Sequence, residues 1–169
     1  MDISYKQKVI SLASDFMKGT MAPDAFYRGL TEALVGTVGC SRASLWRYTN
    51  GLYDKLECLD LYDSGESQHH AGFTLLETDF GAYFEAMQRD NMIVAHHARQ
   101  HPATDCFNES YFEPHGIYSL LDVGISVNGS RWGLFCCEQV TFVKEWSQAD
   151  TEILRSISTL CGMAFKKLP

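Results

Sequence analysis

HPATDCFNESYFEPHGIYSLLDVGISVNGSRWGLFCCEQ, residues 101–139, is the stretch that decides the fold. In its second half, two apolar runs at residues 118–127 and 131–140 are separated by the pair Asn128-Gly129. An Asn-Gly pair favours a type I′ turn, and this turn joins two antiparallel strands. The stretch therefore predicts a β-hairpin.

Helices are predicted on both sides of this hairpin. Three segments carry apolar residues at helical spacing, at residues 3–17, 23–38 and 147–168. Ser147 and Asp150 at the start of the last segment have the spacing of a capping box, with aspartate in place of the usual glutamate. These signals predict two helices before the sheet and one after it.

The middle of the chain predicts a second hairpin and several short elements. Residues 41–49 alternate in polarity, and a return strand at 55–62 follows the turn residues Asn50-Gly51. The polar residues 63–72 predict a loop. Further along, the patterns predict a helix at 79–89, a strand at 92–95 and a short helix at 108–113. This order of elements predicts an α+β fold with an antiparallel sheet.

Composition and charge restrict the class of protein. The 169 residues have the size of a single domain, and we expect one domain over residues 1–169. A net charge of −7 repels phosphate backbones, so no nucleic-acid partner is expected. The sequence shows no signal peptide and no run of roughly 20 apolar residues that could cross a bilayer. We therefore expect a cytoplasmic protein without a membrane partner, in which the six cysteines are reduced.

Residues 101–139 resemble the GAF domain family, in particular the GAF domains that precede diguanylate cyclase (GGDEF), phosphodiesterase (EAL) or histidine kinase modules in bacterial signalling proteins. The resemblance extends over about residues 25–165. The residues that match the pattern of this subgroup are His101, Pro102, Thr104, Ser110, Tyr111, Pro114, Gly116, Ile117, Ser119, Leu121, Asp122, Gly129, Gly133, Cys136 and Glu138. Gly124 departs from the pattern, because the family commonly has a proline there.

The resemblance implies a GAF-like fold, related to PAS and profilin-like domains, with a central antiparallel sheet of about five to six strands. The terminal helices would cover one face, and middle helices and loops would roof a ligand pocket on the other. It also implies a non-catalytic sensory domain that binds a small molecule and signals to an effector domain in the same protein. No specific cofactor or metal is expected. The terminal helices at 3–18 and 147–168 are expected to form a homodimer and to transmit the signal.

Aromatic residues in the middle segment and polar residues on the second hairpin supply the candidate ligand contacts. A small-molecule site is mostly apolar with a few polar groups, which matches this composition. The candidates are Phe73, Phe80, Tyr83, Phe84, His101, Tyr111, His115, Tyr118, Asp122, Cys136 and Glu138. Asp122 and Glu138 are acids within apolar strands, so they either contact a polar ligand group or cap loop amides at a strand end.

Four other interpretations stay open. The aromatic residues could fill the pocket themselves, which would leave a dimerisation or interaction module without a ligand. Cys106 lies in a polar loop, where a GAF enzyme that reduces free methionine sulfoxide uses cysteines, but the cysteine spacing of that enzyme is absent. Covalent attachment of a tetrapyrrole requires a histidine beside the cysteine, and Cys106 has no such neighbour. His96, His97 and His101 could hold a metal only if they lay on a helix, and Pro102 argues against one.

Overall fold

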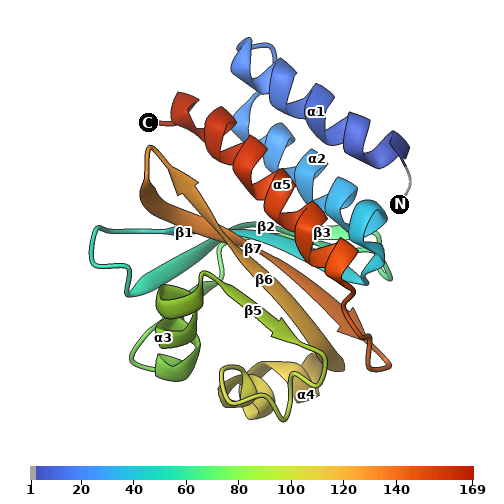
Figure 1. The fold of residues 1–169 in the computed structure, drawn as a ribbon, viewed down its shortest axis with the longest axis vertical. Helices are drawn as coiled ribbons and strands as arrows, with labels where there is room; N and C mark the ends of the chain where they lie inside the picture. The colour runs from blue at the N-terminus through green and yellow to red at the C-terminus, as the bar shows by residue number, and fades with distance from the viewer. Residues whose placement is uncertain (1–2) are drawn as a thin grey trace.

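A seven-stranded antiparallel sheet forms the centre of the computed structural model, which describes residues 3–169 (Figure 1). The strands follow the order β3-β2-β1-β7-β6-β5, and β4 also pairs with β2. Their bounds are β1 Arg42–Tyr48, β2 Lys55–Asp63, β3 Gln68–His70, β4 Thr74–Leu76, β5 Met92–Ala95, β6 Ile117–Val127 and β7 Ser130–Val140. The α+β fold with a central antiparallel sheet is therefore confirmed.

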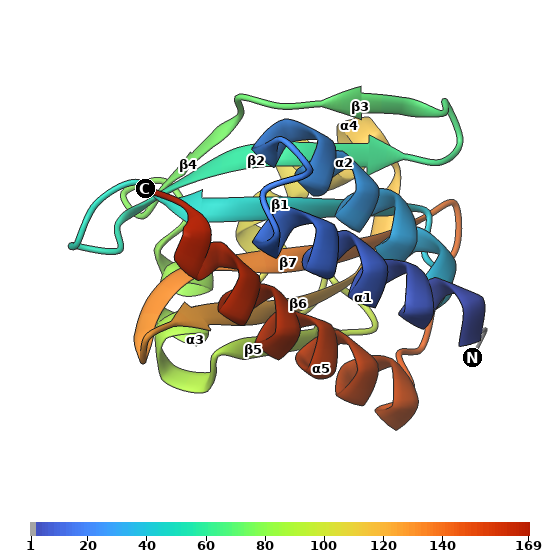
Figure 2. The ribbon, with the colours of Figure 1, turned by 90° about the horizontal axis from the view of Figure 1, so that it is seen from above.

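The helices divide between the two faces of the sheet (Figures 1 and 2). One face carries α1 (Ile3–Met17), α2 (Pro23–Leu34) and α5 (Gln148–Ala164). The opposite face carries α3 (Gly81–Asp90) and α4 (Glu113–His115). The remaining helical turns are a π-turn at Val35–Gly39, a 3₁₀ turn at Asp105–Phe107, a π-turn at Asn108–Phe112 and a 3₁₀ turn at Phe165–Lys167.

Local sequence signals account for the boundaries of the main elements. Asn128 and Gly129 have φ values of 53° and 79°, and two successive positive φ angles define the type I′ turn expected between β6 and β7. Ser147 caps α5, because its Oγ accepts from the backbone N–H of Asp150 while the carboxylate of Asp150 accepts from the N–H of Ser147. Both predictions are confirmed.

Alternation along the strands produces two cores, one on each face of the sheet. On β7, Phe135 and Cys137 face the helices α1, α2 and α5, whereas Leu134 and Cys136 face the other side. The two adjacent cysteines therefore serve different cores. Full burial of one Leu or Phe side chain stabilises the fold by roughly 1.5–3 kcal/mol, so both cores contribute substantially.

The apolar stripes of the terminal helices are covered within the chain itself. Phe16 of α1 stacks on Phe26 of α2 at a ring-centroid distance of 4.5 Å. Phe165, directly after α5, stacks on Trp132 of β7 at 4.2 Å. Among the side chains of these helices whose exposure the structure describes, the large apolar ones that stay exposed are Ile10 of α1 and Met163 of α5.

The loop prediction for residues 63–72 is wrong in part. Gln68–His70 form strand β3, which pairs with the end of β2 and places His69 opposite Tyr62. The segment is polar because it is an edge strand, whose side chains lie largely in solvent, so its composition resembles that of a loop. Within residues 3–169, no helix combines the length and the apolar character that crossing a membrane would require.

Candidate functional site

A cavity of about 370 Å³ lies against the sheet face opposite α1, α2 and α5. Strands β1, β6 and β7 form its floor, while β4, α3 and residues 107–115 form its walls and mouth. Small-molecule pockets occupy roughly 300–1,000 Å³, so the cavity falls within this range. Its lining residues are Arg42, Trp46, Phe73, Thr74, Leu75, Phe80, Tyr83, Phe107, Ser110, Tyr111, Phe112, His115, Leu120, Asp122, Cys136 and Glu138.

Strand register brings the polar residues of the floor together. Glu138 on β7 lies opposite Arg42 on β1 and opposite Leu120 on β6. In the next row of the same face, Cys136 of β7 lies opposite Asp122 of β6. Residues two apart on a strand point to the same side, so both acids belong to one surface.

Glu138 is part of a buried ion-paired cluster. Its Oε1 lies 3.3 Å from Nε of Arg42, and it accepts a hydrogen bond of 3.1 Å from the hydroxyl of Tyr111. That hydroxyl in turn accepts from Nη2 of Arg42 at 3.1 Å. The Nε of Arg42 makes no well-aligned hydrogen bond, so it contacts Glu138 as an ion pair without a hydrogen bond. Burial raises the pKa of Glu138, and the nearby charge of Arg42 opposes this shift.

Asp122 is the second buried acid, and only one of its oxygens is paired. Its side chain is 1% exposed, and its Oδ2 accepts a short hydrogen bond from the hydroxyl of Tyr83. Its Oδ1 is buried and has no hydrogen-bond partner among the described residues. Burial raises the pKa of Asp122 to about 7, although the adjacent Cys136 thiol and the hydrogen bond from Tyr83 oppose the shift. The cavity therefore contains a carboxyl group that changes charge near neutral pH.

Aromatic rings form most of the walls. Phe80 stacks on Phe107 at a centroid distance of 4.5 Å, and Tyr83 meets Phe107 edge-on at 5.1 Å. The mouth is more open, since Ser110 and His115 are exposed and Phe73 is 50% exposed. The arrangement combines a flat apolar interior with two acids on the floor.

The structure gathers most of the predicted site residues in this cavity. Those that line it are Phe73, Phe80, Tyr83, Tyr111, His115, Asp122, Cys136 and Glu138. Phe84 is fully buried behind Tyr83, which it contacts edge-on at 5.9 Å. Nδ1 of His101 accepts a hydrogen bond from the backbone N–H of Ala103, and His101 lies outside the lining.

A bulge in β6 turns Tyr118 away from the cavity. Ile117 pairs with Val140 and Ser119 with Gln139, so Tyr118 is the extra residue on its strand. The Arg99 guanidinium lies 4.1 Å from the centroid of the Tyr118 ring. Regular alternation through this part of the strand would have placed Tyr118 beside Leu120 and Asp122, which is why the sequence pattern favoured it.

The list of candidates from the sequence omitted several lining residues. The most consequential is Arg42, whose partner Glu138 lies far away in the sequence and meets it only through the pairing of β1 with β7. An arginine at the start of an apolar strand is the one signal that could have indicated it. The other omitted residues are Trp46, Thr74, Leu75, Phe107, Ser110, Phe112 and Leu120.

Neither the histidine cluster nor Cys106 belongs to this cavity. Nδ1 of His96 accepts from the backbone N–H of Trp146, and within residues 3–169 no three His, Cys, Asp or Glu side chains are placed to hold a metal ion. Cys106 is half-buried, and burial raises the pKa of its thiol. A raised pKa reduces the thiolate fraction, which is the reactive form.

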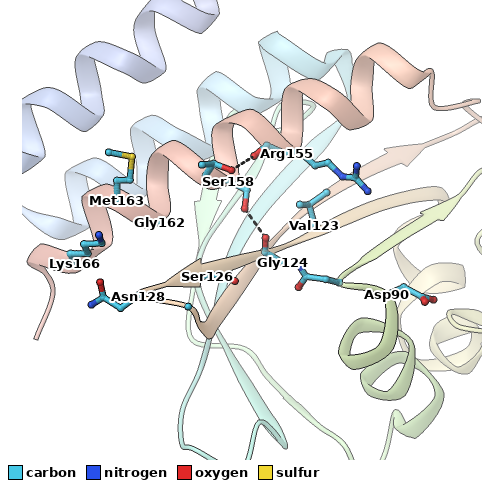
Figure 3. Close-up of a pocket in the computed structure, with 13 residues that line it drawn as sticks. Asp90, Val123, Gly124, Ser126, Asn128, Arg155, Ser158, Gly162, Met163 and Lys166 are labelled. Carbon is cyan, nitrogen blue, oxygen red and sulfur yellow. Dashed lines mark hydrogen bonds between the residues drawn. The ribbon is translucent and has the colours of Figure 1, made fainter.

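A second hollow of about 540 Å³ lies between α5, the β6–β7 hairpin and the end of α3 (Figure 3). Here α5 approaches β6 closely: the hydroxyl of Ser158 donates to the carbonyl oxygen of Gly124 at 2.6 Å (Figure 3). One turn further, a Cβ on Gly162 would lie 2.3 Å from the carbonyl oxygen of Ser126. The helix and the strand are therefore in direct backbone contact at this hollow.

The combination of an antiparallel sheet, helices on one face and an aromatic cavity on the other defines an α+β domain with a cavity of ligand size. The GAF domain family model matches residues 22–165, and the chain belongs to the GAF domain family. The resemblance noted in the sequence is confirmed. No curated protein matches the sequence significantly.

Solved structures of GAF domains share the fold. The phycocyanobilin-bound GAF domain of a cyanobacterial phytochrome superposes with a TM-score of 0.76 at 10% identity, with 99% of each chain covered. The GAF domain of an Acinetobacter phosphoenolpyruvate-protein phosphotransferase has a TM-score of 0.70 at 11% identity, over 98% of this chain and 95% of that one.

The chromophore-binding domain of the Stigmatella aurantiaca bacteriophytochrome has a TM-score of 0.69 at 13% identity. The match covers 99% of the present chain but 61% of that one, so the chain spans less than two thirds of that relative. At identities this low, the TM-scores establish a common fold alone. The ligand has to be derived from the cavity itself.

Proposed function

We propose that this chain is a non-catalytic sensory GAF domain, which binds a small molecule in the aromatic cavity and transmits the binding event through α5. One observation carries the proposal. Strand β6 places Asp122 in the cavity, and two residues later its Gly124 accepts the hydrogen bond from Ser158 of α5. A shift of β6 on ligand binding therefore acts directly on the terminal helix.

The end of the β5 ladder explains why Gly124 is available for this contact. Strand β5 pairs with β6 from Ala95 opposite Leu120 to Met92 opposite Val123, and Gly124 lies just beyond it. The N–H of Gly124 still donates to the carbonyl oxygen of Asn91, and its own carbonyl oxygen accepts from Ser158. One residue thus joins the end of α3, the strand of the cavity floor and α5. A ligand that prefers one arrangement of these elements would shift the population towards it.

The effector is proposed to be a diguanylate cyclase, a phosphodiesterase or a histidine kinase in the same bacterial, cytoplasmic protein, in line with the resemblance in residues 101–139. A homodimer through the terminal helices is part of this proposal. Its support is the exposed apolar surface of Ile10 on α1 and Met163 on α5, together with the general preference of oligomers for two-fold symmetry.

Native mass spectrometry of the purified protein tests the proposal. We expect a small molecule that leaves on denaturation, in a protein of dimeric mass. Bilins are one group to search for, since phycocyanobilin and biliverdin are bound in two structural neighbours. A protein that stays free of any small molecule after exposure to a cell extract would instead support an interaction module without a ligand.

Two variants provide a matched comparison. Ser110→Trp would close the cavity mouth at an exposed lining position, at little cost in stability. Glu109→Trp places the same side chain one residue earlier, at an exposed position outside the lining. We expect the bound molecule to be lost only in Ser110→Trp. Equal retention by both variants would argue that the molecule binds elsewhere.

A further inference from the structure

The cavity contains one buried acceptor that the protein itself does not satisfy. Asp122 is almost completely buried, and its Oδ1 has no hydrogen-bond partner among residues 3–169. A buried polar atom without a partner is unfavourable, and such atoms are rare in native proteins. Asp122 belongs to the cavity lining, so a ligand that displaces the neighbours covering Oδ1 can supply the missing donor.

The oxygen and nitrogen donors near Asp122 are already engaged, and the remaining neighbour, the Cys136 thiol, is only a weak donor. The Tyr83 hydroxyl donates to Oδ2 of Asp122. The Tyr111 hydroxyl donates to Glu138, and the Arg42 guanidinium lies beside that same acid. The cationic group of the cavity thus neutralises Glu138 and leaves Asp122 without a counter-charge. The polar feature left for a ligand to satisfy is an acceptor.

The walls restrict the shape of the ligand. Phe80 and Phe107 stack face to face with an interplanar angle of 26°, and Trp46 and Tyr83 also line the space. Aromatic faces favour a flat partner that stacks against them. The aromatic lining and the single unpaired acceptor together favour a planar ligand with one hydrogen-bond donor.

We infer that the cavity selects a planar, mostly apolar ligand whose N–H group donates to Oδ1 of Asp122; this inference rests on the proposed ligand-binding function. The contact uses an oxygen that Tyr83 leaves free, so both carboxyl oxygens of Asp122 are satisfied in the complex. An isosteric ligand with an oxygen in place of the N–H would bring two acceptors together and bind less well.

Protonation of Asp122 reverses this preference. The titratable groups around its carboxyl are Tyr83 from α3, Cys136 and Glu138 from β7, and Tyr48 from β1, while Ile93 of β5 is its cross-strand neighbour. The ionised carboxylate accepts from a ligand N–H. Once protonated, with Oδ2 still accepting from Tyr83, the Oδ1 hydroxyl donates instead. The inference therefore includes a pH dependence, with N–H ligands favoured on the alkaline side.

Indole and benzofuran test the inference, because they have nearly the same size and differ in an N–H against an oxygen. Both are titrated into the ¹⁵N-labelled full chain and followed by amide chemical shifts, at about pH 8 and about pH 5.5, on either side of the Asp122 titration. At the higher pH we expect indole to bind about fivefold more tightly or better, the worth of one net hydrogen bond. At the lower pH the preference should disappear or reverse.

Asp122→Asn sharpens the test. If Tyr83 donates to the amide oxygen, the amide NH₂ group occupies the place of Oδ1 and donates into the cavity, so benzofuran should bind better than indole at both pH values. Glu113→Gln removes an exposed acid outside the lining and should leave the wild-type preference unchanged.

Equal affinity for indole and benzofuran at the higher pH would overturn the inference while leaving a ligand-binding cavity. Chemical shifts that move only outside the cavity lining would overturn it as well. If neither probe binds at millimolar concentration, the inference fails, and the bound molecule in the mass-spectrometry experiment decides separately whether the proposed function stands.

Discussion

The buried carboxyl of Asp122 predicts an unusual dependence of stability on pH. Its pKa rises from 3.8 in the unfolded chain to about 7 in the folded protein, because burial disfavours the charged form. The folded state therefore holds this proton more tightly, so its contribution to stability is complete below pH 3.8 and is lost as the pH rises through 7. Between about pH 5 and about pH 8, the loss amounts to roughly 2–3 kcal/mol at 1.36 kcal/mol per pKa unit.

Asp122→Asn should remove this dependence, since the amide keeps an acceptor for the Tyr83 hydroxyl but does not ionise. We expect the variant to gain roughly 2–3 kcal/mol relative to the wild type between about pH 5 and about pH 8. Urea denaturation of both proteins at several pH values measures the difference. Taking the difference cancels Glu138 and other groups that titrate alike in both proteins. Parallel stability curves over this range would refute the assignment of a neutral, buried Asp122.

Two further predictions follow from the packing of α5 and from the ion pair on the cavity floor. Gly162→Ala should destabilise the fold by about 1–3 kcal/mol, because the new Cβ would lie 2.3 Å from the Ser126 carbonyl oxygen. The control Gly81→Ala places a Cβ with no heavy atom within 4 Å, so it should be neutral or stabilising by less than about 1 kcal/mol. Thermal melting compares the two, and equal melting temperatures would show that α5 tolerates displacement from β6. Arg42→Met should cost about 3–5 kcal/mol at about pH 8, since Glu138 loses its cation, and less at about pH 5, where Glu138 is more easily protonated. Urea denaturation at the two pH values checks it, and a loss that is the same at both would contradict an ionised Glu138.

Much of the fold could be predicted from residues close together in the sequence. The turn at Asn128-Gly129 needs positive φ angles that this pair readily adopts, so the longest hairpin follows from two residues and their apolar flanks. The capping box of Ser147 and Asp150 is equally local. Strand β3 was not predictable in this way, because only its pairing with β2 distinguishes its polar residues from a loop.

The candidate site also has a part that local sequence predicts and a part that it does not. Alternation on β7 sufficed to place Cys136 and Glu138 on one face, because residues two apart on a strand point to the same side. Asp122 joins them only through the register shift between Ile125 and Ser126, without which the two-residue turn would place it opposite Phe135. The aromatic composition of the middle segment also predicted that its rings line the cavity, as Phe80 and Tyr83 do on or beside α3.

Tertiary structure alone decided the rest. The bulge that turns Tyr118 away depends on which residues of β7 lie opposite β6, and the ion pair of Arg42 with Glu138 depends on the pairing of β1 with β7. The amino-acid sequence by itself determined the α+β fold with its antiparallel sheet, because turns, caps and strand alternation act over a few residues, and the motif in residues 101–139 indicated the GAF family. The unpaired oxygen of Asp122 and the contact of β6 with α5 emerge only after folding, because they require residues far apart in the chain to meet and desolvate one another.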